Sequence, residues 1–195
     1  MATVTAALEG DSDVSVVRKL LAETGHDLAI VQGLRGKSFL TANLKGYNNA
    51  AKFSPWLVVR DLDLDAACAA ELIGDLLPAP ARKMLFRVAV REIEAWLLAD
   101  KENVASFLAV AKSRVPSEPD TLSDPKLTLV NLARRSRKKA IRQDMVPPSG
   151  WSGTVGPAYV SRIGEFARDH WRPFEAAKNS DSLRRCLHRL KAWNP

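Results

Sequence analysis

The sequence predicts an α/β fold, with a parallel sheet of four strands flanked by helices over residues 1–100 and an all-helical extension after it. Three observations predict this fold. Four short apolar runs in the first half are bounded by turn residues and separated by segments with helical periodicity. Acidic residues follow three of these runs. After residue 100 only helical stretches recur, between breaks rich in proline or glycine. Strands alternating with helices are typical of a mostly parallel sheet.

The predicted strands are residues 4–8, 28–31, 56–59 and 85–90, each rich in apolar or β-branched side chains. Between them we expect a helix that begins near Val14 and another over 66–77, capped by Asp65. The stretch from Gly33 to Lys52 reads as irregular or as a short helix. A further helix begins near Glu92, directly after the fourth strand.

The second half carries clear helix start signals. We expect helices over 101–111, from Pro125, over 158–170 and over 181–193. Asp100, Asp124 and Ser180 precede three of them and are the expected caps, and proline suits the first turn after Asp124. The helix from Pro125 is expected to continue into a run of cations at 134–139. Residues 101–195 are therefore predicted to form a basic helical extension packed on a core formed by residues 1–100.

Length and composition place the chain among ordinary globular proteins. Its 195 residues suffice for one domain with a substantial core, and 46% of them are hydrophobic while 26% are charged. We expect a cytoplasmic protein, since no apolar run is long enough for a membrane span and no signal-peptide pattern opens the chain. Cys68 and Cys186 lie far apart without a partner motif and are expected to be buried thiols. A zinc site has no supporting histidine spacing.

Charge is divided unevenly along the chain. Residues 1–100 hold 11 Lys and Arg against 13 Asp and Glu, a net of −2, while residues 101–195 hold 18 against 9, a net of +9. This division suits a protein with acids at one site and a cationic surface that binds a polyanion such as nucleic acid. A merely solvated basic surface is the alternative. The candidate phosphate-binding residues are Arg35, Lys37, Arg134, Arg135, Lys138 and Lys139.

Three acidic groups follow three different predicted strands. They are Glu9 with Asp11 and Asp13, then Asp61 with Asp63, then Glu92 with Glu94. Because the carboxyl ends of parallel strands meet at one edge of a sheet, these groups are expected to share a crevice. Carboxylates that close repel one another, and a divalent cation, Mg²⁺ or Mn²⁺, would hold them ionised.

Only one residue of the third acidic group is expected to face a metal ion. If both lie on a helix, Glu92 and Glu94 diverge by about 200°, given 3.6 residues per turn. Glu94 is the favoured ligand of the two. The alternative for Glu92 is a favourable interaction with the positive end of the helix dipole.

The order strand-Glu-Gly-x-x-Asp, at Glu9 to Asp13, followed by strand-Asp-x-Asp, at Asp61 and Asp63, resembles the TOPRIM domain. That domain is shared by topoisomerases, primases and the overcoming-lysogenization-defect nucleases. The segment REIEAWLLAD at 91–100 further resembles small, stand-alone TOPRIM-like bacterial proteins, some of them linked to phage defence. The resemblance to the domain covers roughly residues 3–100.

The resemblance implies roles for particular residues. Glu9 matches the family's general acid or base, and Asp61 and Asp63 match its metal-binding pair. Asp13 matches an acid of the nuclease-type members, and Glu94 falls more loosely where some members add another. The implied activity is a Mg²⁺- or Mn²⁺-dependent phosphodiester hydrolase acting on DNA or RNA, with a separate ATPase as partner and a role in phage defence. An active-site tyrosine context, as in topoisomerases, is missing.

Other function classes remain as alternatives. One is a non-catalytic module that binds nucleic acid or an ATPase partner through the same fold. Another is a phospho-receiver domain. It is disfavoured because the chain has too many aspartates after the third strand and no later strand that ends in the lysine such domains use. An ATP-binding loop at Gly36 is rejected, because Val31 stands where its first glycine is required. The oligomeric state is left open.

Two aromatic residues flank a glycine-rich loop in the second half, Trp151 and Tyr159. Both could stack on nucleobases. Packing against the sheet is the role that the sequence favours for them.

Overall fold

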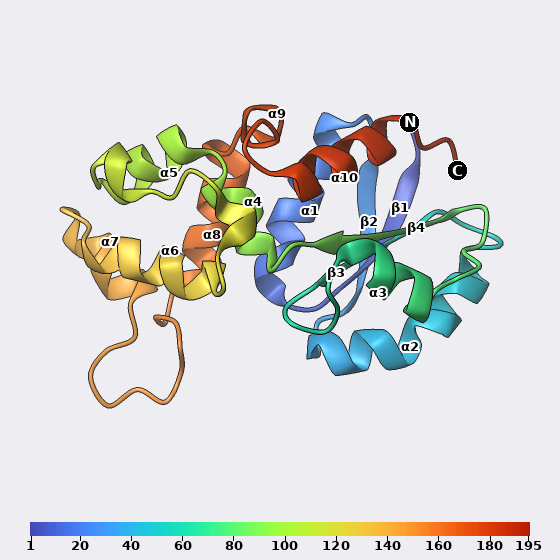
Figure 1. The fold of residues 1–195 in the computed structure, drawn as a ribbon, viewed down its shortest axis with the longest axis horizontal. Coiled ribbons are helices and arrows are strands. Elements are labelled where there is room, and N and C mark those ends of the chain that lie inside the picture. The colour runs from blue at the N-terminus through green and yellow to red at the C-terminus, as the bar shows by residue number, and fades with distance from the viewer.

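A parallel four-stranded sheet forms the centre of the computed structural model, which describes all 195 residues (Figure 1). The strands are β1 (Thr3–Leu8), β2 (Asp27–Gly33), β3 (Trp56–Asp61) and β4 (Met84–Ala89). They lie in the order β2-β1-β3-β4, and all three pairings are parallel. The predicted fold class is confirmed, and the alternation of strands with crossover helices is its cause.

Helices cover both faces of the sheet because its side chains alternate between two apolar cores. Ala6 and Leu57 contribute to the larger core, while their neighbours Ala7 and Val58 contribute to the smaller one. The helices α1 (Asp11–Glu23) and α10 (Asp181–Lys191) supply side chains to the larger core. The helices α2 (Gly36–Ala50) and α3 (Ala69–Leu76) supply the smaller core on the other face.

The rest of the chain is helical. It comprises α4 (Ile93–Leu98), α5 (Lys101–Leu108), α6 (Pro125–Arg134), α7 (Lys139–Met145), α8 (Tyr159–Asp169), α9 (Pro173–Ala176) and two short 3₁₀ turns, Lys112–Arg114 and Pro119–Thr121. Helix α8 packs against α1, and the larger core runs without interruption from the sheet into these helices. None of the helices combines the length and the apolar character that crossing a membrane requires.

The last helix returns to the sheet. Helix α10 packs against β4, and His26 Nε2, in the loop before β2, lies 3.0 Å from the Leu190 carbonyl oxygen near the end of α10. Figure 1 shows α10, in red, beside α1. The sheet is therefore flanked by helices from both ends of the chain.

The predicted caps of three helices in the second half are confirmed. Asp124 accepts a hydrogen bond from the backbone N–H of Leu127 at 2.7 Å, and Pro125 occupies the first helical turn. Asp100 and Ser180 cap α5 and α10 in the same way. These contacts span three residues, so local sequence determines them.

A 15-residue helix, α2, fills the segment that the sequence left as irregular or a short helix, because Leu40 and Leu44 form an apolar face that packs on the sheet. The predicted start and cap of the next helix were wrong. Helix α3 begins at Ala69 rather than at residue 66, and Cys68 occupies its N-cap position. Asp65 does not cap it, because its carboxylate is bound by Arg60 instead, at 2.6 Å.

The basic run 134–139 does not continue a helix, as the sequence suggested. Helix α6 ends at Arg134 and α7 begins at Lys139, so the cations lie along the connection between them. Ser136 is buried in this connection, and its hydroxyl accepts a hydrogen bond from the Lys138 backbone N–H at 3.0 Å. That local bond competes with helical hydrogen bonding and turns the chain.

The two cysteines differ in their surroundings. Cys186 is buried as expected, and burial raises the pKa of its thiol to about 11. Cys68 is exposed at the start of α3, which corrects the prediction of two buried thiols. It lies in the segment whose helix starts later than expected, so it does not reach the core.

Candidate active site

Carboxylates from three strand ends come together at the C-terminal edge of the sheet. Glu9 follows β1, Asp61 ends β3 and Glu94 lies in the first turn of α4, shortly after β4. Two hydrogen bonds connect these ends. Glu9 Oε1 accepts from the backbone N–H of Asp61 at 2.9 Å, and Asp61 Oδ1 accepts from the backbone N–H of Ile93 at 2.9 Å. The parallel topology thus gathers acids that are up to 85 residues apart in sequence (Glu9 to Glu94).

Asp13 adds a fourth carboxylate from the first turn of α1. It is 7% exposed, and its Oδ2 accepts a hydrogen bond from the Gly10 backbone N–H at 3.0 Å. Its other oxygen accepts from the Ser12 hydroxyl at 3.1 Å. Asp13 is close enough for its charge to raise the pKa of both Asp61 and Glu94. We name Glu9, Asp13, Asp61 and Glu94 the acidic cluster.

Glu94 is the most deeply buried member of the acidic cluster, with 1% of its surface exposed. Its Oε1 accepts a hydrogen bond from the Tyr159 hydroxyl at 3.1 Å, while its Oε2 is buried without any hydrogen-bond partner. Burial raises the pKa of Glu94 to about 7, although the charge of Lys126 works in the opposite direction. An unsatisfied buried carboxylate oxygen is rare in folded proteins and indicates a missing ligand or proton.

Lys126, in the first turn of α6, supplies the cation next to this cluster. Its Nζ lies 3.5 Å from Glu94 Oε1 and 3.8 Å from Glu92 Oε1, and its backbone N–H donates to Glu92 Oε2 at 2.8 Å. Burial lowers the pKa of Lys126, but the charges of Glu94 and Glu92 more than offset this, so the pKa lies above its ordinary value. Lys126 is therefore fully protonated at neutral pH.

Glu92 and Glu94 both reach Lys126, because they do not lie on one helix. Glu92 is the N-cap residue of α4, with an extended backbone at φ −135° and ψ 159°, and only Glu94 is helical. The expected divergence of about 200° applies to two helical residues. It does not hold here, and Glu92 stands at the edge of the site.

The pKa values of the whole group are raised. For Asp61 the pKa lies well above its ordinary value because of burial and then because of the charges of Asp13, Glu94 and Glu9. Burial is also the first cause for Glu9 and for Asp13. The site therefore carries more negative charge than its one lysine neutralises, and a proton or a cation stabilises it.

Asp63, the second acid of the Asp-x-Asp pair, is directed toward a different partner. Its backbone is left-handed, with φ 46°, and its carboxylate is bound by Lys37 Nζ at 2.6 Å. Its charge still contributes to the raised pKa of Glu9, so it borders the acidic cluster. Lys37, expected to bind phosphate, is held by Asp63 and by Asp65 at 3.1 Å.

The donor set suits a hydrated divalent cation better than a fully dehydrated one. No set of three or more His, Cys, Asp or Glu side chains is arranged to coordinate a metal ion directly. Mg²⁺ usually keeps several water ligands and binds through only one or two carboxylates. The unpaired Glu94 Oε2 and the neighbouring carboxylate of Asp61 fit that requirement, with Glu9 and Asp13 close by.

The remaining cations predicted to bind nucleic acid lie in two places. Arg35 adjoins the acidic cluster, since the backbone N–H of the next residue, Gly36, donates to the Glu9 carbonyl oxygen at 2.9 Å. Arg35 is exposed with its guanidinium 4.4 Å from the Phe39 ring centre. Arg134 and Arg135 are exposed at the end of α6, opposite to the end that carries Lys126. Eight residues of helix place them about 12 Å along the axis from Lys126, given a rise of 1.5 Å per residue. Lys138 and Lys139 follow, both exposed.

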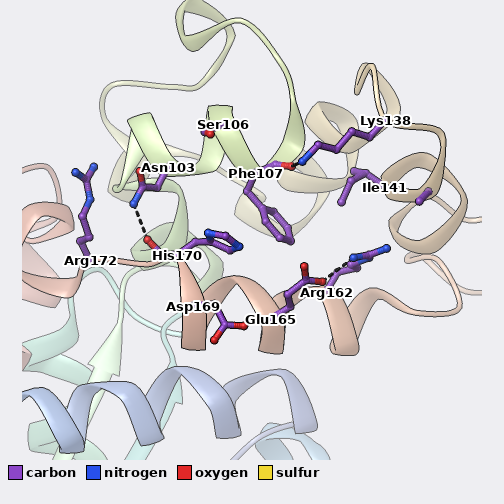
Figure 2. A pocket seen from close by; sticks show the side chains of 11 residues that line it. Asn103, Ser106, Phe107, Lys138, Ile141, Arg162, Glu165, Asp169, His170 and Arg172 are labelled. Carbon is purple, nitrogen blue, oxygen red and sulfur yellow. Dashed lines mark hydrogen bonds and ion pairs between the residues drawn. The ribbon is translucent and has the colours of Figure 1, made fainter.

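Lys138 borders a separate cavity of about 440 Å³ between α5, α7 and α8 (Figure 2). Its Nζ donates to the Phe107 carbonyl oxygen at 3.3 Å. The His170 and Phe107 rings are tilted by 47° with centres 5.3 Å apart, and Arg162 is paired with Glu165 at 2.6 Å. No member of the acidic cluster lines this cavity, so it is distinct from the candidate active site.

Sequence reasoning missed Lys126 and Arg60, and it gave Tyr159 a different role, packing against the sheet. Arg60 is 6% exposed, and its charge lowers the pKa of Glu9 against the effect of burial. Lys126 follows a correctly predicted helix start, and Tyr159 follows a recognised loop, but no local pattern connects either one to Glu94. An arginine inside an apolar strand was the only signal available for Arg60.

No family model and no curated protein matches this chain. Two solved structures are similar to it. One is the C-terminal region of the Burkholderia pseudomallei OLD protein, with 13% identity, a TM-score of 0.45 and 98% of each chain covered. The other is the C-terminal region of the Xanthomonas campestris pv. campestris OLD protein, with 19% identity, a TM-score of 0.37 and coverage of 85% of this chain and 92% of that one.

Proposed function

We propose that the protein is a metal-dependent phosphodiester hydrolase that acts on nucleic acid with Mg²⁺ or Mn²⁺. One observation carries the proposal. The buried Glu94 Oε2 has no partner, and it belongs to a group of four carboxylates with raised pKa values beside a single protonated lysine. Such an arrangement at the C-terminal edge of a parallel sheet is suited to a divalent cation and an anionic substrate.

The residues of the site would have distinct roles. Asp61 and Glu94 would hold the cation, with Asp13 beside them, and the bound ion would supply Lewis acidity toward a phosphate oxygen and a water molecule. Glu9 is partly exposed and burial raises its pKa, which suits it to exchange a proton with the reacting groups. Lys126, being protonated, would stabilise negative charge that develops on the phosphate.

The charge of the second half supports nucleic acid as the substrate. Residues 101–195 carry a net charge of +9, and Arg134, Arg135 and Lys139 are exposed. Cations on the surface would hold the backbone phosphates, while the acidic cluster would act on one of them. A separate ATPase partner and a role in phage defence rest on the family resemblance alone and stay predictions.

A non-catalytic nucleic-acid-binding module is the second candidate. It is favoured by one observation: no three side chains are arranged to coordinate a metal ion directly. In that case the raised pKa values would keep the acidic cluster partly protonated, and Lys126 would neutralise its remaining negative charge. The basic surface would then be the only functional part of the chain.

Cleavage assays separate the two candidates. Labelled DNA and RNA, and supercoiled plasmid, would be incubated with the protein in Mg²⁺, in Mn²⁺ and in EDTA. We expect metal-dependent cleavage by the wild type, abolished in Asp61→Asn with Glu94→Gln and unchanged in Asp75→Asn, an exposed acid of α3. Binding without cleavage in either metal would favour the second candidate, and cleavage that survives in the double variant would overturn the proposed site.

A further inference from the structure

The loop between α7 and α8 exposes a tryptophan. Residues 147–158 project away from α6 and α7, downward and in orange in Figure 1. The Trp151 side chain on this loop is 53% exposed. It does not pack on the sheet as the sequence suggested. An exposed indole is able to stack on an unpaired nucleobase.

The ring of Trp151 is held in place although it is exposed. A Cβ atom on Gly153 would lie 2.4 Å from Trp151 Nε1, so the indole rests directly on the Gly153 backbone. The Trp151 backbone N–H donates to the Pro148 carbonyl oxygen at 3.1 Å. At the base of the loop the Gly156 backbone N–H donates to the Met145 carbonyl oxygen at 3.0 Å. A pre-positioned ring loses little conformational entropy when a partner stacks on it.

Two cations lie beside the base of this loop. Lys139 and Arg142 line a surface hollow of about 430 Å³ together with Pro147 and Pro148, and no carboxylate contributes to its lining. Lys139 is exposed and forms no ion pair, and Arg142 donates to the carbonyl oxygen of Ser136 rather than to an acid. Both positive charges are therefore free to attract an anion.

The loop is continuous in sequence with a residue that contacts the candidate active site. It ends at Tyr159, whose hydroxyl donates to Glu94 Oε1 at 3.1 Å. Trp151 stands eight residues before Tyr159. A strand bound by the loop is thus bound by the segment that also contacts the acidic cluster.

We propose that Trp151, Lys139 and Arg142 form a binding site for single-stranded nucleic acid. The indole stacks on an unpaired base, and the two cations bind flanking phosphates. This inference rests on the proposed function and names its substrate class. Stacking needs an accessible base face, which an intact duplex buries between its base pairs. Among nucleic acids, an exposed and fixed aromatic ring beside cations therefore selects a strand with unpaired bases.

The test measures binding in EDTA, so that cleavage plays no part. Fluorescence anisotropy of a labelled 20-nucleotide single strand, and of the matching duplex, would be recorded with the full-length protein. We expect Trp151→Ala to weaken binding of the single strand about tenfold, as loss of one stacked base predicts, and to change duplex binding little. Trp151→Phe should retain most of the affinity. Phe53→Ala removes an aromatic ring that is 81% exposed elsewhere and is the matched control, with no expected change.

Two further variants address the mechanism. Gly153→Ala places a methyl group where the indole lies and should weaken single-strand binding while Trp151 is still present. Lys139→Glu with Arg142→Glu should flatten the dependence of log affinity on log salt by about 0.7 for each lost phosphate contact.

The outcomes for this site and for the acidic cluster are separable. Unchanged single-strand binding in Trp151→Ala, or an equal loss for single strand and duplex, would overturn the stacking site and leave cleavage by the acidic cluster intact. Conversely, a protein that cleaves nothing but loses single-strand binding in Trp151→Ala would retain this site as a binding surface, while the proposed hydrolase activity would fail.

Discussion

The Lys126 ammonium lies 3.5 Å from Glu94 Oε1, and Glu94 is almost completely buried. The pair joins α6 to α4 and brings a protonated lysine against the most buried acid of the candidate active site. Because the other Glu94 oxygen has no partner, the pair alone does not satisfy this carboxylate. We therefore expect stability and metal binding to be coupled at this residue.

Removal of one member of the pair should destabilise the protein more than removal of both. Breaking a buried ion pair leaves an uncompensated charge. We expect Lys126→Met to lower the free energy of unfolding by about 1 to 3 kcal/mol, less than for a fully buried pair, because the lysine side chain is 35% exposed and water screens it. The double variant with Glu94→Gln should recover part of the loss in urea unfolding. An additive double-variant cycle would show that the two residues do not interact.

Stability of the metal-free protein should fall as pH rises through the range set by Glu94. Its pKa is raised from 4.5 to about 7 in the folded state, so the folded protein binds more protons than the unfolded chain between these values. Each pKa unit corresponds to about 1.4 kcal/mol. The free energy of unfolding should therefore fall by about 3 kcal/mol from about pH 4.5 to above pH 7. Burial raises the pKa of Asp61 as well, which adds a contribution of the same sign.

Urea unfolding in EDTA at pH 5 and at pH 8 measures this effect. Glu94→Gln, which cannot ionise, should be less sensitive to pH than the wild type. If the variant and the wild type lose equal stability over this range, Glu94 is not the titrating group.

Mg²⁺ should stabilise the folded protein, and more strongly at pH 8 than at pH 5.5, because its carboxylate ligands must be ionised. At a concentration of about 100 times Kd the expected gain is about 2.7 kcal/mol. Asp61→Asn with Glu94→Gln should abolish the gain, measured as the shift of Tm on addition of Mg²⁺. Asp75→Asn serves as the control with an intact response. A shift of equal size in the double variant would place the metal elsewhere.

Charge reversal at the far end of α6 should weaken binding of nucleic acid without affecting the acidic cluster. Arg134 and Arg135 are exposed and would contact phosphates, so their replacement by Glu should reduce the salt dependence of binding by about 0.7 to 0.9 for each lost contact. Lys45→Glu with Lys52→Glu makes the same change in net charge on exposed residues elsewhere. Salt-titrated binding of nucleic acid by the wild type and by both double variants tests this prediction. Equal losses of affinity in the two variants would mean that net charge alone attracts the nucleic acid.

Local sequence determined the strands, most helices and the positions of the acids relative to the strand ends. Short apolar runs rich in β-branched residues predict where strands lie, and a parallel arrangement then brings Glu9, Asp61 and Glu94 to one edge. Helix caps such as Asp124 were predictable because the cap and its partner are three residues apart. In each case the determining interaction lies within a few residues or follows from the sheet topology.

Tertiary structure alone decided which groups complete the site. Lys126 and Tyr159 reach the acids because α6 and the start of α8 pack near α4, across separations of 34 residues from Glu92 and 65 from Glu94. Asp65 binds Arg60 rather than capping α3. An unpaired buried arginine costs more free energy than a helix N-terminus without a side-chain cap. Contacts of this kind depend on how helices pack, and the packing is determined by apolar faces distributed over the whole chain rather than by any local pattern.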